Sequence, residues 1–399
     1  MTLRCRACGH SGLEILIDFG SMPLAGGFLD GPSAIAAEQR FPLPVHVCNR
    51  CALVQIAQPI DPAILFNNYS FSASTIPALV AHFDTYAGWL IDRFKPNIVV
   101  EFGCNDGVLL RPLAQRGVRA VGVDLSDNIS EKARLEGHDV VTAAFTSEVA
   151  SQIRDRVGPA DVVTGSNAFA HNADPETLLA ATDTALGENG RLCLEVMYAG
   201  DLYELLQWDT LYHEHLTFYG LSQLDALLRS HDFVVEHAER IPMHGGSLRV
   251  VAARAAKAVP DVSVEDLTSF EKATGLTDAD TWHEFAHRSR RTIEVVGSLF
   301  NDLRERHRIW GYGAAGKATM WLNACNLDFL EGMVDASPLR IGKLMPGTHT
   351  PICSPEEFRN AEPPSMILVT AWNYLDAIRH NENWYKGIWA TPLPSLSFS

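Results

Sequence analysis

Apolar and polar residues follow two different rhythms along the N-terminal half of the chain. From residue 61 to residue 95, apolar side chains recur at helical spacing, as Leu79, Phe83 and Leu90 do, until Pro96 interrupts the pattern. Beyond this point short apolar runs alternate with longer stretches of helical character. We expect these runs to form buried strands at residues 98–102, 120–124, 161–166 and 191–197. Strands that alternate with helices predict an α/β fold with a parallel sheet covered on both faces.

The C-terminal part of the chain repeats this rhythm. Apolar runs at residues 308–312, 332–335 and 365–370 predict a second α/β unit, and residues 262–306 predict helices with a polar, charged face. Residues 1–60 are rich in turns and predict a small module dominated by loops. Because 399 residues exceed what one hydrophobic core usually supports, we expect three domains. Their expected bounds are 1–60, 61–260 and 261–399, the last including the helical linker.

Composition narrows the classes of partner. Lys and Arg total 32 against 48 Asp and Glu, so the formal charge is −16, which argues against general binding to nucleic acid or anionic membranes. No apolar run approaches the roughly 18 residues that a membrane span requires. Glu14 and Asp18 fall where a signal peptide needs an unbroken apolar core, so we expect a cytoplasmic protein.

Four of the eight cysteines form two Cys-x-x-Cys pairs, Cys5 with Cys8 and Cys48 with Cys51. Zinc in a structural site binds four thiolates in a tetrahedron, and each tight Cys-x-x-Cys turn, or knuckle, provides two of them. Since four thiolates leave no position for a reactive water, the predicted zinc is structural. Four small buried thiols and a redox pair are the alternatives.

A second motif, from Glu101 to Gly107, stands directly after a predicted strand and before a helix. Glycines there allow a tight turn and close approach of a ligand to the backbone. Asp124 ends the next strand, where a carboxylate can hold ribose hydroxyls. Together these features indicate a nucleotide site, although the turn lacks the glycine spacing of a dinucleotide site.

This turn resembles the acidic-x-Gly loop of class I S-adenosylmethionine-dependent methyltransferases, with Asn105 in place of the usual second glycine. The resemblance implies that the loop wraps the methionine part of the cofactor, that Asp124 holds the ribose, and that Ala144 or Phe145 faces the adenine. Ordinary core packing is the alternative for Phe145. The cofactor-binding residues implied in this way are Glu101, Gly103, Asn105, Asp106, Gly107, Asp124, Phe145 and Asn167.

The third motif is Tyr212-His213-Glu214-His215, after the fourth predicted strand. A histidine with a pKa near neutrality can remove a proton, and an adjacent carboxylate or phenol can orient it. A solvated loop and a metal pair of His213 with His215 are the alternatives. The fourth motif, Gly311 to Gly316 followed by Lys317, has dinucleotide glycine spacing. With Asp335 at the end of the following strand, it leaves a nicotinamide site open.

Over nearly its full length the chain resembles the nucleotide-sugar C-methyltransferase family, which combines a four-cysteine zinc module, a class I methyltransferase domain and a C-terminal Rossmann-like domain. The matching segments are the cysteine pairs, Pro23-Leu24-Ala25, Asn105-Asp106-Gly107, residues 167–171, 212–215, 244–249 and 311–315, Pro346-Gly347-Thr348-His349, and Ala371-Trp372-Asn373.

The resemblance implies methyl transfer to C3 of a 4-keto sugar linked to a nucleoside diphosphate. His215 would remove the proton next to the ketone, with Glu214 and Tyr212 near the sugar. Tyr69 could add a hydroxyl, although a packed aromatic is its alternative, and here Phe71 and Ala73 depart from the family pattern. The substrate-binding residues implied are His171, His244, Arg249, Gly313, Ala315, Lys317 and Asn373; for Arg249 a surface ion pair is the alternative.

Several points stay open at the level of sequence. A sugar O-methyltransferase needs the same cofactor and also a base, a nicotinamide-dependent sugar oxidoreductase would use residues 311–316, and a zinc-ribbon binding module is a third class. The expected substrate is TDP- or GDP-linked. We expect a monomer or small homo-oligomer that binds no nucleic acid and no membrane.

Overall fold

A computed structural model describes residues 3–67 and 69–399 of the chain. Its internal contacts separate two compact units. Unit 1 contains residues 3–14, Val47–Gly200 and Leu216–Ala279, and unit 2 contains Ile15–His46, Asp201–His215 and Asp280–Ser399. Each unit therefore includes part of the N-terminal segment, and the three-domain division with bounds near residues 60 and 260 stays a proposal.

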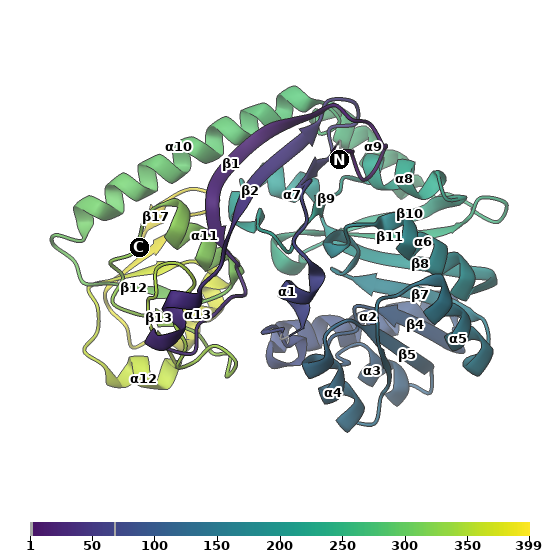
Figure 1. The fold of residues 1–399 in the computed structure, drawn as a ribbon, viewed down its shortest axis with the longest axis horizontal. Helices are drawn as coiled ribbons and strands as arrows, with labels where there is room; N and C mark the ends of the chain where they lie inside the picture. Colours follow the sequence, from purple (N-terminus) through teal and green to yellow (C-terminus); the bar gives the residue numbers. More distant parts are fainter. Residues whose placement is uncertain (1–2, 68) are drawn as a thin grey trace. The chain divides into compact units, whose positions relative to one another are not determined.

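Unit 1 is built on a seven-stranded sheet with the order β10-β11-β8-β7-β4-β5-β6. The parallel strands are β4 (Ile98–Phe102), β5 (Arg119–Asp124), β6 (Asp139–Thr142), β7 (Ala160–Ser166) and β8 (Leu186–Met197). The antiparallel pair β10 (Phe233–Ile241) and β11 (Ser247–Arg254) extends the sheet beyond β8 (Figure 1). The four strands predicted in this region are confirmed, with β8 beginning five residues earlier than expected.

Helices cover both faces of this sheet. They are α2 (Pro77–Phe94), α3 (Leu110–Gln115), α4 (Asp127–Leu135), α5 (Ser147–Val157), α6 (Pro175–Ala185), α8 (Leu221–Arg229) and α9 (Val262–Ala273). Adjacent residues of β4 face opposite cores, because Val99 packs with Leu79 and Phe83 of α2 whereas Val100 joins the cluster of α5, α6 and α8. This alternation confirms the α/β class and explains why the strands are continuous apolar runs.

The stretch from 61 to 95 is helical only in part, whereas the sequence predicted helical character along its length. It contains α1 (Pro62–Phe66), the 3-10 turn η2 (Ala73–Thr75) and then α2. Ile76 precedes Pro77 and is extended, as residues before proline usually are, so α2 begins only at Pro77. The intervening residues form other contacts described below.

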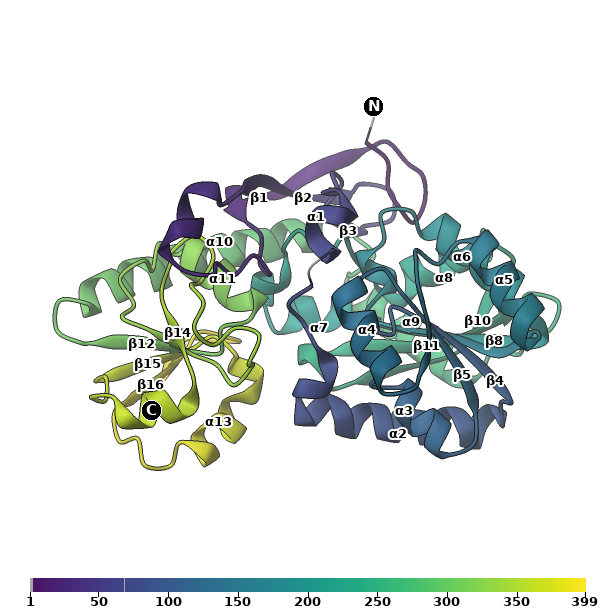
Figure 2. The ribbon, with the colours of Figure 1, turned by 60° about the horizontal axis from the view of Figure 1, so that its bottom comes forward.

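Unit 2 contains a six-stranded sheet with the order β14-β13-β12-β15-β16-β17. Its parallel strands are β12 (Ile309–Tyr312), β13 (Met333–Val334), β14 (Ile352–Cys353), β15 (Met366–Val369) and β16 (Ile388–Thr391), and β17 (Ser397–Phe398) is antiparallel (Figure 2). The helices are α10 (Ala279–Leu303), α11 (Gly316–Ala324), α12 (Pro355–Asn360) and α13 (Leu375–Asn381). The second α/β unit predicted from sequence is thus confirmed.

The remaining described strands belong to a third sheet, and the other elements are short helical turns. β1 (Leu13–Pro23), β2 (Arg40–Cys48), β3 (Val54–Gln55) and β9 (Thr217–Phe218) form a third sheet in that order. Short helical elements are α7 (Ala199–Glu204), η1 (Pro32–Ala37), η3 (Phe169–His171), η4 (Trp208–Thr210), η5 (Met243–Gly245) and η6 (Trp372–Tyr374). Among the described residues, every helix is too short or too polar to cross a lipid bilayer.

Candidate functional site

The four predicted metal ligands lie together in unit 1. The sulfur atoms of Cys5, Cys8, Cys48 and Cys51 all lie within 4.8 Å of one another. The Sγ atoms of Cys5 and Cys51 are 3.5 Å apart, and those of Cys8 and Cys48 are 3.7 Å apart. Zn–S bonds of about 2.3 Å in a tetrahedron place the sulfurs roughly 3.8 Å apart, so the cluster fits one zinc ion.

The glycine-containing loop after β4 has the tight geometry that the sequence predicted. Gly103 has φ +68°, and a Cβ on it would lie 2.3 Å from the Cβ of Ala168. Asn105 also has a left-handed φ of 51°, which asparagine tolerates better than most residues. Asparagine can therefore occupy the position where the methyltransferase loop usually has a glycine.

Two acidic residues define the edge of the sheet beside this loop. The Asp124 carboxylate accepts hydrogen bonds from the backbone N–H groups of Asn105, at 2.9 Å, and Ser126, at 2.8 Å. Glu101 is buried, and its Oε2 has no hydrogen-bond partner among the described residues. Burial, followed by the nearby carboxylates of Asp124, Glu195 and Asp106, raises the pKa of Glu101 well above its ordinary value. A cationic ligand would relieve this electrostatic cost.

The segment between α1 and α2 is fastened to the same loop. Asp106 accepts hydrogen bonds from the hydroxyls of Ser72, at 2.5 Å, and Ser74, at 2.6 Å. The Asn105 side chain accepts from the backbone N–H of Ala73 at 2.9 Å. The two serines on either side of Ala73 therefore hold residues 72–74 against the loop. Sequence analysis missed this role of Ser74, because the pairing joins segments about 30 residues apart.

Aromatic side chains and His171 lie near one another in unit 1. The Tyr69 ring is 5.3 Å from that of Phe66 and 6.2 Å from that of Phe71, between ring centroids. Phe66 also lies 6.3 Å from the ring of His171. Burial, aided by His244, lowers the pKa of His171 to about 4, so its imidazole is neutral at pH 7. This part of unit 1 thus joins three predicted site residues: Tyr69, His171 and His244.

Asn167 adds a second unpartnered polar atom. It follows β7 with a left-handed φ of 53°, and its backbone N–H donates to the Glu195 carbonyl at 2.7 Å. Its buried side-chain Oδ1 has no partner among the described residues. β7 neighbours β4 in the sheet, so the strand ends that carry Asn167 and Glu101 lie at the same edge.

Two predicted ligand contacts have other partners. Phe145 is buried and stacks on Phe102, with ring centroids 5.6 Å apart, which favours the core-packing alternative. Arg249 is buried, and its guanidinium pairs with Glu195 at 2.7 Å and Glu239 at 2.8 Å. The alternative for Arg249 was a surface ion pair. The structure shows an ion pair, but it is buried inside unit 1.

In unit 2, the segment from 212 to 215 is buried rather than solvated. His213, Glu214 and His215 are buried, and the His213 Nε2 atom lies 3.3 Å from the Pro42 carbonyl oxygen. The His215 Nδ1 atom is 2.7 Å from the Thr210 carbonyl oxygen. Burial, followed by the carboxylates of Glu214 and Asp209, raises the pKa of Tyr212 well above its ordinary value, so its phenol stays protonated.

Asp209 anchors this segment to α11 and η6 of unit 2. It is fully buried, and its Oδ2 accepts hydrogen bonds from the indole N–H groups of Trp321, at 3.0 Å, and Trp372, at 2.9 Å. Lys317 lies over the Trp372 ring, with Nζ 4.6 Å from the centroid. Sequence analysis did not identify Asp209; its place three residues before Tyr212 was the available indication.

The glycine turn after β12 lies against the same segment. Gly313 has φ +97°, and a Cβ there would lie 2.4 Å from the Cβ of Ala371. A Cβ on Gly316 would lie 3.0 Å from the Tyr212 ring. Unit 2 thus brings Tyr212 to the start of α11, next to the predicted contacts Gly313, Ala315 and Lys317. Asn373 lies in η6, which follows β15, the neighbour of β12.

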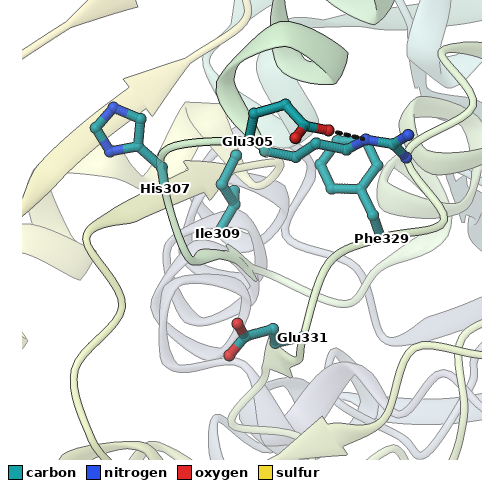
Figure 3. A pocket seen from close by; sticks show the side chains of 6 residues that line it. Glu305, His307, Ile309, Phe329 and Glu331 are labelled. Atoms are coloured by element: carbon teal, nitrogen blue, oxygen red, sulfur yellow. Dashed lines mark ion pairs between the residues drawn. The ribbon is translucent and has the colours of Figure 1, made fainter.

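A cavity of about 330 Å³ in unit 2 lies elsewhere (Figure 3). It is lined by Arg304, Glu305, His307, Ile309, Phe329 and Glu331. These residues surround the amino ends of β12 and β13, whereas ligands of open α/β sheets bind at the carboxyl ends. The cavity is therefore distinct from the predicted substrate contacts.

Comparisons with known proteins found similarity along most of the chain. Family models match in three stretches: a zinc binding domain at residues 5–66, a methyltransferase domain at 78–238, and a C-methyltransferase C-terminal domain at 242–394. The C-methyltransferase NovU of Streptomyces niveus is 34% identical over 401 residues, covering 98% of this chain and 95% of that protein.

More distant similarities are confined to part of the chain. A ubiquinone biosynthesis O-methyltransferase of Cupriavidus pinatubonensis is 30% identical over 109 residues, which is 26% of this chain and 44% of that protein. The crystal structure of magnesium protoporphyrin IX methyltransferase from Synechocystis PCC 6803 with bound SAH has a TM-score of 0.36 and 18% identity. That match covers 44% of this chain and 83% of the other.

Proposed function

Because this chain belongs to the C-methyltransferase family that includes NovU of Streptomyces niveus, we propose which carbon it methylates. The acceptor is C3, next to the ketone of a 4-keto sugar linked to a nucleoside diphosphate. A ketone acidifies the neighbouring C–H bond, so a positioned base can generate a carbon nucleophile there. The reaction requires a cofactor site, a base, a hydrogen-bond donor to the enolate oxygen and a binding site for the diphosphate.

The carboxyl edge of the unit 1 sheet supports the cofactor assignment. S-adenosylmethionine carries an ammonium group and a sulfonium, and when bound it supplies an electrophilic methyl group. The unpartnered Oε2 of Glu101 and Oδ1 of Asn167 are suited to a cationic ligand with N–H donors. Asp124, at the end of the next strand, is placed to accept hydrogen bonds from ribose hydroxyls.

His215 is the proposed base. In the neutral imidazole, the Thr210 carbonyl requires the proton to be on Nδ1, which leaves the lone pair on Nε2. Nε2 takes the proton from C3, and the Tyr212 phenol, which stays protonated, donates a hydrogen bond to the developing enolate oxygen. Glu214 is the proposed neighbour that orients the sugar.

The start of α11 is the proposed site for the diphosphate. Backbone N–H groups at a helix N-terminus attract anions, and Lys317 adds a cation there. The observation that carries the proposal is the packing of Tyr212 against Gly316, because it joins the predicted sugar-side segment to the predicted diphosphate turn within unit 2. The nicotinamide alternative is less favoured, because the Asp335 carboxylate is paired with the Arg340 guanidinium.

A substrate panel tests this function. The purified protein is incubated with S-adenosylmethionine carrying a labelled methyl group and with TDP- and GDP-linked 4-keto sugars, each beside its 4-hydroxyl counterpart. Mass spectrometry should find one labelled methyl group on a 4-keto sugar and none on the matched alcohol. Methylation of the alcohol would favour an O-methyltransferase instead. No transfer to any sugar, with cofactor binding verified, would show that the proposed substrate class is wrong.

A further inference from the structure

Arg6 lies inside the first cysteine knuckle, between Cys5 and Cys8. Its guanidinium donates to backbone carbonyl oxygens: Nη1 to Ile56 at 2.7 Å and Leu216 at 3.3 Å, and Nε to Ala173 at 3.1 Å. Among the described residues it forms no ion pair with a carboxylate. The planar guanidinium has five N–H donors in fixed directions, so a single arginine can donate to several carbonyls at once.

The backbone of Arg6 is fixed as well. Its N–H donates to the Gln55 side-chain oxygen at 3.2 Å, and Gln55 is fully buried in β3. Because Cys5 and Cys8 belong to the four-sulfur cluster, a bound metal would hold the backbone on both sides of Arg6. The guanidinium therefore extends from a backbone that the metal site keeps in place.

A fourth carbonyl, that of Ala57, accepts from Nη2 at 3.5 Å. The carbonyls of Ile56, Ala173 and Leu216 belong to segments that are distant in sequence. Ile56 follows β3, Ala173 follows η3, which ends at His171, and Leu216 directly follows His215. Arg6 thus connects the cysteine knuckle to two segments. One follows the predicted substrate contact His171, and the other begins directly after the proposed base His215. All the atoms that make these hydrogen bonds lie in unit 1.

Both the backbone N–H and the backbone carbonyl of Leu216 form hydrogen bonds. Its N–H donates to the Ala170 carbonyl at 3.0 Å, and its own carbonyl accepts from the Ile56 N–H at 3.0 Å in addition to Arg6. The next residues, Thr217 and Phe218, pair with β3. Leu216 is the first residue of unit 1 after the segment that carries His215, so this clamp fixes where that segment ends.

We propose that Arg6 is a positioning residue for methyl transfer. The cysteine knuckle holds the backbone of Arg6 in place, and the guanidinium fixes the Leu216 carbonyl. This holds the adjacent His215 in the orientation needed for proton abstraction. The role of His215 rests on the proposed function above; the clamp itself does not. The metal module then contributes to turnover through Arg6 as well as to folding.

The variants Arg6→Gln and Arg6→Lys test the proposal, with Arg4→Gln as the matched control. Arg4 is an exposed neighbour directly before this knuckle, and its Nη1 donates a hydrogen bond to the Gly9 carbonyl at 3.1 Å. Lysine keeps the charge but cannot donate to carbonyls in several directions. Each protein is examined for zinc content, S-adenosylhomocysteine affinity, amide hydrogen exchange, and kcat and KM on a substrate found in the panel.

In both Arg6 variants, zinc content and cofactor affinity should match the wild type, and the peptides covering 54–57 and 216–218 should exchange about tenfold faster. The kcat value should fall about tenfold or more while KM changes less than about threefold. Arg4→Gln should behave as the wild type. Unchanged exchange would refute the clamp, and faster exchange with unchanged kcat would refute its positioning role.

The hydrogen-exchange measurement on Arg6 does not depend on which acceptor the enzyme methylates. If the wild type methylates no 4-keto sugar, the exchange measurement still decides whether Arg6 fixes Leu216, and kcat is then compared on whichever acceptor the enzyme methylates. Loss of zinc in Arg6→Lys, the variant that keeps the charge, would show that Arg6 supports the metal module itself and would overturn the proposed positioning role.

Discussion

The Nδ1 atom of His215 lies 2.7 Å from the backbone carbonyl oxygen of Thr210, five residues earlier in the chain. A carbonyl oxygen only accepts hydrogen bonds, so this contact selects the tautomer with a basic Nε2. Thr210 ends η4, and the preceding Asp209 is bonded to two tryptophan indoles. The Thr210 carbonyl and the buried Asp209 anchor thus hold the Nδ1 side of the imidazole within unit 2.

The first prediction concerns this histidine. His215→Ala should abolish both methyl transfer and the exchange of the sugar α proton with solvent deuterium, because the base is gone. Cofactor affinity should remain within about twofold, since the proposed cofactor residues lie in unit 1. His213→Ala is the matched control, and it should retain both reactions because His213 is not assigned to proton transfer. Deuterium exchange that persists in His215→Ala would identify another residue as the base.

The second prediction concerns the cysteine cluster. Replacing Cys5 and Cys8 with serine should remove the bound zinc and lower the Tm by roughly 10 °C, because metal binding contributes to folding. Metal analysis and thermal unfolding measure the two effects. Cys353→Ser, outside the cluster, should change neither. A double variant that stays as stable as the wild type but loses turnover would contradict a structural role for the metal.

The third prediction follows from the raised pKa of Glu101. A carboxyl group whose pKa is raised in the folded state contributes most stability below its ordinary pKa of about 4.5, and this contribution is lost as pH rises toward the folded value. Glu101→Gln cannot ionise, so the cofactor-free variant should become more stable than the wild type as pH increases from about 5. Chemical unfolding at several pH values measures this difference.

The same variant should bind S-adenosylmethionine about tenfold more weakly, because it lacks the carboxylate proposed to face the cationic cofactor. Calorimetry in buffers with different ionisation enthalpies should also show that the wild type releases a proton on binding. Equal affinity of Glu101→Gln and the wild type would rule out this role for Glu101.

The fourth prediction separates structure from substrate binding at Arg249. Arg249→Met leaves the buried Glu195 without its guanidinium partner and should lower the free energy of unfolding by about 3 kcal/mol. Arg229→Met, which removes an exposed pair with Asp225, should cost less than about 1 kcal/mol. Chemical unfolding and substrate KM are measured together. A large rise in KM for Arg249→Met without loss of stability would restore the substrate-binding interpretation.

The sequence predicted the central strands of the two α/β sheets well, because these strands are mostly buried. It missed the third sheet: residues 1–60 were expected to be dominated by loops, but they contain β1, β2 and β3, and β1 mixes buried and exposed residues without a continuous apolar run. Continuous apolar runs located β4, β5 and β7 to within a residue, and the spacing of Cys5, Cys8, Cys48 and Cys51 predicted the cluster that the structure shows. These features depend on local patterns, which a single sequence contains.

Other features depend on pairing between distant segments, which local patterns do not reveal. The break between α1 and α2 is stabilised by Ser72 and Ser74 binding Asp106, more than 30 residues away. Arg249 was predicted to bind the substrate, with a surface ion pair as the alternative, because its buried partner Glu195 is 54 positions distant. Asp209 gave no local indication of its two indole partners, which are more than 100 residues further along the chain.

The most direct test of the central claim is to locate the transferred methyl group by NMR. The protein is incubated with S-adenosylmethionine carrying a ¹³C-labelled methyl group and with the nucleoside-diphosphate-linked 4-keto sugar that it accepts. We predict a labelled methyl group bonded to C3, with the proton of that carbon lost. A labelled methyl group bonded to oxygen, or to a carbon that is not adjacent to the ketone, would contradict it.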